Sequence, residues 1–293
     1  MSLASKTSNR PYAKITSKLF TFVCMLSMWI CLAALAILLW NIFSYGWSRV
    51  SFSFLTTQPS QINPEKSGIV SSLVGSIYLI GLTALFSVPI GVGTAVYLEE
   101  YSSASRWRTL VQTNIANLAG VPSIVYGILG LGLFVRTMSL QRSVVAGALT
   151  LTLVVLPIVI LSTQEALRAV PGTIRQASFA LGASRLQTVW YQILPASLPG
   201  ILTGVILALS RALGEAAPLV AIGAATYVRT APRNLWEDDF SALPLQIYNW
   251  TDQSQEAFHE AAAGAIVVLL TVLICMNALA VILRYRLSKK IHW

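Results

Sequence analysis

The sequence is poor in charge, in histidine and in cysteine, and each shortage excludes a class of protein. Charged residues make up 11% of the 293 residues, whereas soluble domains carry roughly 25%, so a soluble globular chain is excluded. With two histidines, His259 and His292, the chain has no HExxH pattern and no histidine cluster for a metal ion. All three cysteines lie in apolar stretches, which argues against a disulfide framework.

The motifs of nucleotide and nucleic-acid chemistry are missing as well. No GxxxxGK[ST] phosphate loop occurs, so the chain lacks that device for hydrolysing a nucleotide. The net charge of +9 is not accompanied by a basic stripe with interleaved aromatic residues, so we expect no nucleic-acid partner. No nucleophile and base pair can be assembled from the apolar stretches, and we expect neither catalysis nor a cofactor in this chain.

Hydrophobic residues, in contrast, make up 55% of the chain and give it a mean hydropathy of +0.69. Six apolar stretches reach the roughly 20 residues that a helix needs to cross a hydrocarbon core of about 30 Å. The sequence therefore predicts an all-α, polytopic membrane protein with six transmembrane helices. The six stretches are residues 19–43, 69–98, 110–135, 144–163, 198–225 and 264–283.

Lysine and arginine predict the orientation of these helices. They are about twice as frequent on the segments that include both ends of the chain as on the opposite side, and positive residues near helix ends stay in the cytoplasm. We therefore expect both termini to be cytoplasmic. The basic start resembles a secretory signal, but its roughly 25 apolar residues exceed the usual 7 to 15, which favours a retained first helix.

This topology divides the chain into one transmembrane domain with two tails. We expect a cytoplasmic tail over residues 1–18, the six-helix domain over 19–284 and a second cytoplasmic tail over 285–293. Within the domain, residues 164–197 form an internal loop and residues 226–262 an external loop. The external loop is acidic, so it would repel an anion rather than collect one.

The internal loop is too polar to cross a membrane and too regular for a plain connector. Apolar residues recur near helical spacing on either side of Gly182, which predicts two short helices bent at that glycine. One interpretation is a compact projection that docks on a partner. The other is an interfacial helix resting on lipid headgroups, and the spacing alone leaves both open. The recurring residues are Ile174, Ala177, Leu181, Leu186, Val189 and Ile193.

The same segment, "QASFALGASRLQTVWYQILP", resembles the EAA loop of bacterial ABC-importer permeases. Its first triplet carries Gln and Ser where the family pattern has Glu and Ala, and Gln192 stands where the pattern has Ile. The resemblance implies that this loop docks into a groove of an ATP-hydrolysing subunit. The matching positions are Gln176, Ala177 and Ser178 for the triplet, Gly182 for the glycine, and Gln192, Leu194 and Pro195 for the closing signature.

Three further stretches, at 117–135, 207–219 and 243–250, resemble the phosphate-specific branch of these permeases. The resemblance implies a type I importer fold in the bacterial inner membrane and ATP-driven import of inorganic phosphate. It also implies three kinds of partner: a second permease subunit, two copies of an ATPase subunit that bind ATP and Mg²⁺, and an external phosphate-binding protein. Sulfate and molybdate permeases share Leu-Gly-Glu at 213–215 but usually continue with Phe-Gly, so they are the alternative.

The fifth apolar stretch contains two charges, Arg211 and Glu215. Residues four apart on a helix share one face about 6 Å apart along the axis. A charge at mid-bilayer costs about 2.5 to 3.5 kcal/mol on insertion scales, so we expect both side chains to point into the protein. They form either a structural ion pair or an anion pathway in which Arg211 binds phosphate and Glu215 holds the arginine when the path is empty. The resemblance favours the pathway.

Gly214 and Pro218 lie next to this pair. Pro218 removes a backbone hydrogen bond and Gly214 leaves room for close approach, so we expect the helix to bend here and to act as a gate. Two other classes stay possible on the sequence alone. A proton-coupled transporter would also bury an arginine and a glutamate, and a structural or signalling subunit would not need the arginine for flux.

Overall fold

The computed structural model describes residues 11–224 and 227–288, and its regular structure in these ranges is helical apart from one isolated bridge between Ser143 and Asp239. By length and composition, five helices can cross a membrane, and a bent pair can supply a sixth span. The all-α, polytopic prediction is confirmed. The long helices are α1 (Pro11–Gly46), α3 (Val70–Val96), α6 (Val144–Arg168), α9 (Leu194–Gly214) and α12 (Glu256–Ser288).

The shorter elements cap the long helices or connect them. The α-helical ones are α2 (Phe52–Thr56), α4 (Arg106–Ala119), α5 (Ser123–Gly130), α7 (Gly172–Ala180), α8 (Arg185–Thr188), α10 (Ala217–Ala221) and α11 (Leu243–Thr251). Two 3₁₀ turns, η1 (Trp47–Arg49) and η2 (Pro64–Lys66), and three π-helical turns, η3 (Tyr97–Tyr101), η4 (Leu131–Thr137) and η5 (Val189–Ile193), complete the order.

The third expected span, residues 110–135, is not one helix. Its two halves, which include α4 and α5, meet at an angle of 102°. α4 ends at its cap Gly120, and Pro122 is extended, with ψ of 133°. A proline disfavours helical geometry in the residue before it, so the chain turns between Gly120 and Ser123. The prediction of a continuous helix was wrong because it weighed apolar length and not this proline.

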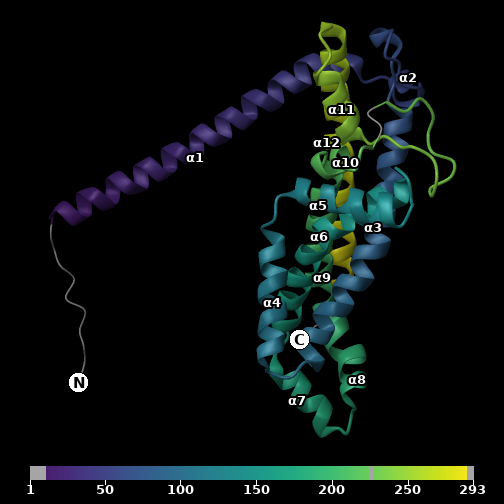
Figure 1. Cartoon of the computed structure of the whole chain (residues 1–293). Coiled ribbons are helices and arrows are strands. Elements are labelled where there is room, and N and C mark those ends of the chain that lie inside the picture. The colour runs from purple at the N-terminus through teal and green to yellow at the C-terminus, as the bar shows by residue number, and fades with distance from the viewer. Residues whose placement is uncertain (1–10, 225–226, 289–293) are drawn as a thin grey trace.

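Helix α6 forms the centre of the bundle. Of its most apolar window, 72% of the residues are buried, against none in α1. Helices α3 and α9 pack against α6 (Figure 1). On the α9 side the approach is close, since a Cβ at Gly204 would lie 2.0 Å from the Ser162 hydroxyl oxygen of α6. Val155 and Val159 of α6 form one apolar cluster with Ile201 of α9.

Helix α1 runs away from the bundle (Figure 1). It contacts α12 at its carboxyl end, where a Cβ at Gly46 would lie 2.6 Å from the Ala263 carbonyl. Its outward side chains are large and apolar, including Phe20, Trp29 and Trp40. Such a surface is stable against lipid tails or another apolar protein surface and not against water.

The two loops expected on opposite sides of the membrane lie at opposite ends of the bundle. Helices α7 and α8 of the internal loop are at one end, and α2 and α11 are at the other (Figure 1). Which end faces the cytoplasm stays a prediction.

Candidate functional site

The end of α9 holds the two charges of the fifth span. The helix stops at Gly214, and Glu215 is its cap in an extended conformation, with φ of −83° and ψ of 109°. After Ala216 the chain starts α10, with Pro218 in its first turn. A proline at this position is tolerated because the first turn has no partner for its N–H. The expected bend at Pro218 is therefore a complete break that comes before the proline.

Arg211 and Glu215 form the expected ion pair. The Arg211 Nε donates to Glu215 Oε1 at 3.1 Å. The arginine side chain is 47% exposed and the glutamate 18%. The expectation that both charges point into the protein was thus wrong for Arg211 within this chain. A Cβ at the adjacent Gly214 would meet no atom within 4 Å, so the close approach expected at that glycine is not made to the described part of this chain either.

The rest of α9 explains why this face stays open. Ala208 and Ala212 are buried against α6, and the Ser210 hydroxyl donates to Asn277 Oδ1 of α12. These contacts use two faces of α9. Arg211 and the 64% exposed Leu207 occupy the remaining one. The C-terminal turn of a helix also favours a cation there, because the unpaired carbonyls carry partial negative charge.

Helix α10, which follows the break after α9, packs against α5, which follows the bend between Gly120 and Ser123. A Cβ at Gly127 of α5 would lie 2.7 Å from the Pro218 Cα and 2.6 Å from the Ala221 Cβ. Glycine is therefore required for α10 to pack directly on α5. The two interrupted spans, α4–α5 and α9–α10, therefore contact each other through their short second halves, α5 and α10. This contact lies beside the Arg211–Glu215 pair.

The internal loop has the predicted hinge. Gly182 joins α7 to α8 with φ of +82°, a conformation that glycine adopts without strain. The Ser178 and Thr188 hydroxyls are 2.8 Å apart and link the two helices. Ser184 starts α8 with a capping box completed by Gln187. Of the other expected coupling residues, Gln176 and Ala177 are exposed on α7, and Leu194 and Pro195 start α9.

The apolar residues of this loop do not all face one way. Ile174, Val189 and Ile193 pack into the cluster beneath it. Leu181 is 89% exposed and Leu186 is 65% exposed, so these two residues face outward on either side of the hinge. The two short helices bent at Gly182 are as the spacing predicted. A surface depression of about 510 Å³ beside the hinge is lined by Ser178, Leu181, Gly182, Ala183, Gln187, Tyr191 and Gln192.

A third polar group, which the sequence reasoning missed, lies at the end of α3. Glu99 and Glu100 of η3 are both at most 10% exposed, and each pairs with arginine. Adjacent carboxylates after an apolar span were a visible signal in a chain with 11 acidic residues. Their partners lie on α4, α6 and α7. We call these five residues the ionic cluster: Glu99, Glu100, Arg108, Arg168 and Arg175.

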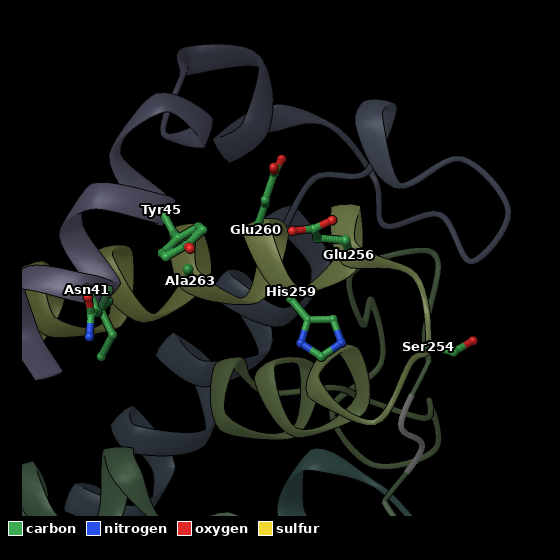
Figure 2. A pocket seen from close by; sticks show the side chains of 8 residues that line it. Asn41, Tyr45, Ser254, Glu256, His259, Glu260 and Ala263 are labelled. Carbon is green, nitrogen blue, oxygen red and sulfur yellow. The ribbon is translucent and has the colours of Figure 1, made fainter.

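A cavity of about 470 Å³ between α1 and α12 has the wrong charge for an anion. Asn41 and Tyr45 of α1 face Glu256, His259 and Glu260 of α12 there (Figure 2). The two carboxylates would repel a phosphate. Among the described residues, no group of three or more His, Cys, Asp or Glu side chains could hold a metal ion.

The fold defines a class, a helical protein with several membrane-spanning segments. Residues 87–292 match the family described as binding-protein-dependent transport system inner membrane component. This chain belongs to that family. It is therefore a multi-pass inner-membrane transport subunit.

Named relatives match nearly the whole chain. The probable ABC transporter permease protein YqgI of Bacillus subtilis is 35% identical over 89% of this chain and 92% of its own length. The phosphate transport system permease protein PstA 1 of Mycobacterium tuberculosis is 33% identical, covering 94% and 91%. PstA of Haemophilus influenzae is 33% identical, covering 91% and 93%.

Solved structures confirm the importer permease fold. A chain of a bacterial alginate ABC transporter superposes with a TM-score of 0.62 over 93% of this chain and 96% of that chain, at 15% identity. A chain of the MetNI methionine ABC transporter gives 0.61 over 75% and 95%, at 16% identity. At this identity the similarity shows the fold alone.

Proposed function

We propose that this chain is the phosphate-conducting permease subunit of an ATP-driven importer, similar to the PstA proteins. The observation that carries the proposal is the half-exposed Arg211 at the break of a membrane-spanning helix. The relatives named as phosphate transport permeases support phosphate as the solute, and they favour it over sulfate or molybdate.

The exposure of Arg211 limits what can cover it. An arginine facing hydrocarbon would cost about 2.5 to 3.5 kcal/mol or more, so protein or water must lie against this face of α9. A second permease subunit with an aqueous path between the two chains satisfies both conditions. Arg211 then borders the path, and Leu207 and Gly214 share its surface.

The geometry of the guanidinium suits an anion. Glu215 takes the bond from Nε, and neither Nη atom of Arg211 has a hydrogen-bond partner in the described part of the chain. Two Nη donors match two phosphate oxygens bidentately. Glu215 holds the arginine in place while the path is empty, and the substrate competes for the same charge.

The partners follow from the family. We infer a PstC-like second permease subunit, two PstB-like ATPase subunits that bind ATP and Mg²⁺, and an external PstS-like phosphate-binding protein. This chain then needs no cofactor or nucleotide site of its own. The α7–Gly182–α8 projection, exposed at one end of the bundle, is the docking surface for the ATPase. That end and both termini are then cytoplasmic.

Transport follows an alternating-access cycle. ATP closes the ATPase dimer, the projection around Gly182 moves with it, and the breaks at Glu215 and at Gly120 to Pro122 let the short helices α10 and α5 shift. Gly214 and Pro218 flank the break after α9 and form the gate. The acidic external loop leaves the first capture of phosphate to the binding protein.

The test is radiolabelled phosphate uptake by cells producing the whole transporter, with Arg211→Gln compared with wild type at equal membrane abundance. Arg106→Gln is the matched control, because Arg106 is exposed at the start of α4 and forms no ion pair with any residue that the structure describes. We expect Arg211→Gln to lose uptake and the control to keep it.

Three results would contradict the proposal or redirect it. Undiminished uptake in Arg211→Gln would reduce the pair to a packing element of a structural or signalling subunit. Competition by sulfate or molybdate would reassign the solute. Uptake that survives ATP depletion and collapses with the membrane potential would indicate a proton-coupled transporter.

A further inference from the structure

The ionic cluster lies where four elements meet, η3, α4, α6 and α7, and the proposed transport path does not use it. Its two carboxylates belong to η3, the π-helical turn that ends α3. Glu99 is 9% exposed and Glu100 is 10% exposed. Carboxylates this buried are stable only when they are paired, and the structure pairs them with different elements.

Glu100 binds the internal projection. Arg175 of α7 donates from Nη2 to Glu100 Oε1 at 2.7 Å and from Nε to the same oxygen at 3.2 Å. The same guanidinium donates to the carbonyls of Val170 at 2.8 Å and Leu167 at 3.0 Å. Arg175 thus joins α7 to α3 and to the carboxyl end of α6, whose last carbonyls need such donors.

Glu99 binds the two neighbouring helices instead. Arg108 of α4 donates to Glu99 Oε2 at 3.1 Å, and the Arg168 Nε of α6 donates to Oε1 at 3.0 Å. Glu99 therefore fixes α3 against α4 and α6. Its neighbour Glu100 pairs with Arg175 of the projection. Glu99 therefore joins α3 to the bundle, and Glu100 joins α3 to the projection.

The covalent connections of the projection do not include α3. Helix α7 follows α6 directly and continues through α8 and η5 into α9, whereas Glu100 is 75 residues away from Arg175 in sequence. A movement of α7 reaches α6 and α9 through the chain itself. It reaches α3 through side chains: the Glu100–Arg175 pair, Ile174 in the apolar cluster with Leu98, and Arg185 stacked 5.9 Å from the Tyr101 ring.

We propose that the Glu100–Arg175 ion pair is the link that makes α3 follow the projection during transport. Both are positioning residues that act through the helices they join and do not touch the solute. The inference rests on the proposed function, in which the ATPase moves α7 and α8. A directional, multiply bonded charge pair resists sliding in a way that the apolar contact of Ile174 and the stacking of Arg185 on Tyr101 do not.

The main test measures phosphate transported per ATP hydrolysed by the complete transporter in liposomes. We expect Glu100→Gln and Arg175→Gln each to lower this ratio by about tenfold, equivalent to about 1.4 kcal/mol of coupling. ATPase activity and subunit assembly should stay near wild type. Because both changes cut one link, the double variant should be no worse than either single variant. Glu65→Gln, at an exposed glutamate outside the cluster, is the control.

A second measurement tests the Glu100–Arg175 link without using any transported solute. Spin labels at Ser103 and Thr173, both exposed, report the distance between the end of η3 and α7 in the assembled complex, after replacement of Cys24, Cys31 and Cys275. With the link intact, the distance should stay the same with and without bound nucleotide. In Glu100→Gln it should change with nucleotide.

The outcomes separate this proposal from the transport proposal. An unchanged phosphate-to-ATP ratio in assembled Glu100→Gln complexes overturns the link, and so does a proportional fall of uptake and ATPase activity, which is what a purely structural role produces. If the wild-type complex moves no phosphate, the proposed function fails. The link is then decided by the label distance alone.

Discussion

Two groups of charged residues differ in how they are paired and how far they are buried. One is the Arg211–Glu215 pair at the end of α9, and the other is the ionic cluster at the end of α3. Arg211 makes one described bond to Glu215 and is 47% exposed. In the ionic cluster, each glutamate is at most 10% exposed and accepts several bonds from arginine. A half-exposed pair contributes about 0 to 1 kcal/mol, so it can exchange partners. A buried pair that loses one member leaves a costly unpaired charge, so it holds helices together.

The difference teaches that an ion pair's role depends on what replaces it when it breaks. When the Arg211–Glu215 bond opens, water or an anion can reach the guanidinium. When a cluster bond opens, Glu99 or Glu100 loses a partner in a site that little water reaches. The predictions below break or sharpen this contrast, beginning with the largest effect.

Reversing the charge at Arg211 should have the largest effect. Arg211→Glu removes the cation and places two carboxylates close together at the end of α9, where they repel each other and an anion. We expect phosphate uptake to fall at least about 100-fold, equivalent to about 2.7 kcal/mol, with the complex still assembled. Arg106→Glu is the matched reversal at an exposed arginine and should transport normally. Equal losses in both variants would contradict a special role for Arg211.

Removing the charge of Glu99 should affect stability more than transport chemistry. Glu99→Gln leaves Arg108 and Arg168 close together without a carboxylate. Breaking a buried pair costs about 3 to 5 kcal/mol, but Arg168 is 55% exposed, so solvent screening reduces the expected loss to about 2 kcal/mol. Thermal unfolding of the purified complex measures it, with Glu65→Gln as control. A melting temperature equal to that of the control would show that the ionic cluster does not stabilise the packing of these helices.

Changing the hinge of the projection should have a smaller, local effect. Gly182→Ala places a side chain on a residue with φ of +82°, at a cost of about 1 to 2 kcal/mol. Gly172→Ala is a matched control, since a Cβ meets no atom within 4 Å at either glycine and only Gly182 has positive φ. We expect weaker copurification of the ATPase with Gly182→Ala alone. Equal retention in both variants would argue that the hinge conformation does not matter for docking.

The smallest effect concerns a carboxylate that pairs with backbone instead of arginine. In the external loop, the amides of Asn234 and Arg233 donate to Asp238, which lowers the pKa of that carboxyl. A lowered pKa in the folded state stabilises the loop above the ordinary value of about 3.9, and this stability is lost as pH falls below it. The protection of the amides of residues 233 and 234 against hydrogen exchange, measured relative to the intrinsic rate at each pH, should fall in that range.

Asp238→Asn should remove the pH dependence of this protection, and Asp252→Asn, at an exposed aspartate, should not. Protection in wild type that is constant through the same pH range would show that the backbone bonds are unimportant for the loop. Asp238 would then not be an example of a carboxylate whose bonds to backbone amides stabilise the structure around it.

Local patterns predicted a large part of the fold and of the site. The apolar stretches that became α3, α6 and α12 were visible by length, and the hinge was visible because apolar residues recur near helical spacing on either side of Gly182. The Arg211–Glu215 contact was predicted because a spacing of four residues nearly fixes a helical neighbour. Each of these depends on residues that are close in sequence.

The remaining features depended on residues far apart. That Arg211 faces out of the chain follows from how α6 and α12 occupy the other faces of α9. The breaks at Pro122 and Glu215 form a unit because α10 packs on Gly127 of α5.

By itself, the sequence determined a multi-helix membrane protein, a hinged projection and a charged pair four residues apart, since hydrophobic length and helical spacing are local properties. The tertiary structure decided which face of α9 stays open and which arginines reach Glu99 and Glu100 across separations of up to 75 residues. Such contacts are selected by the packing of whole helices, and no short stretch of sequence specifies them.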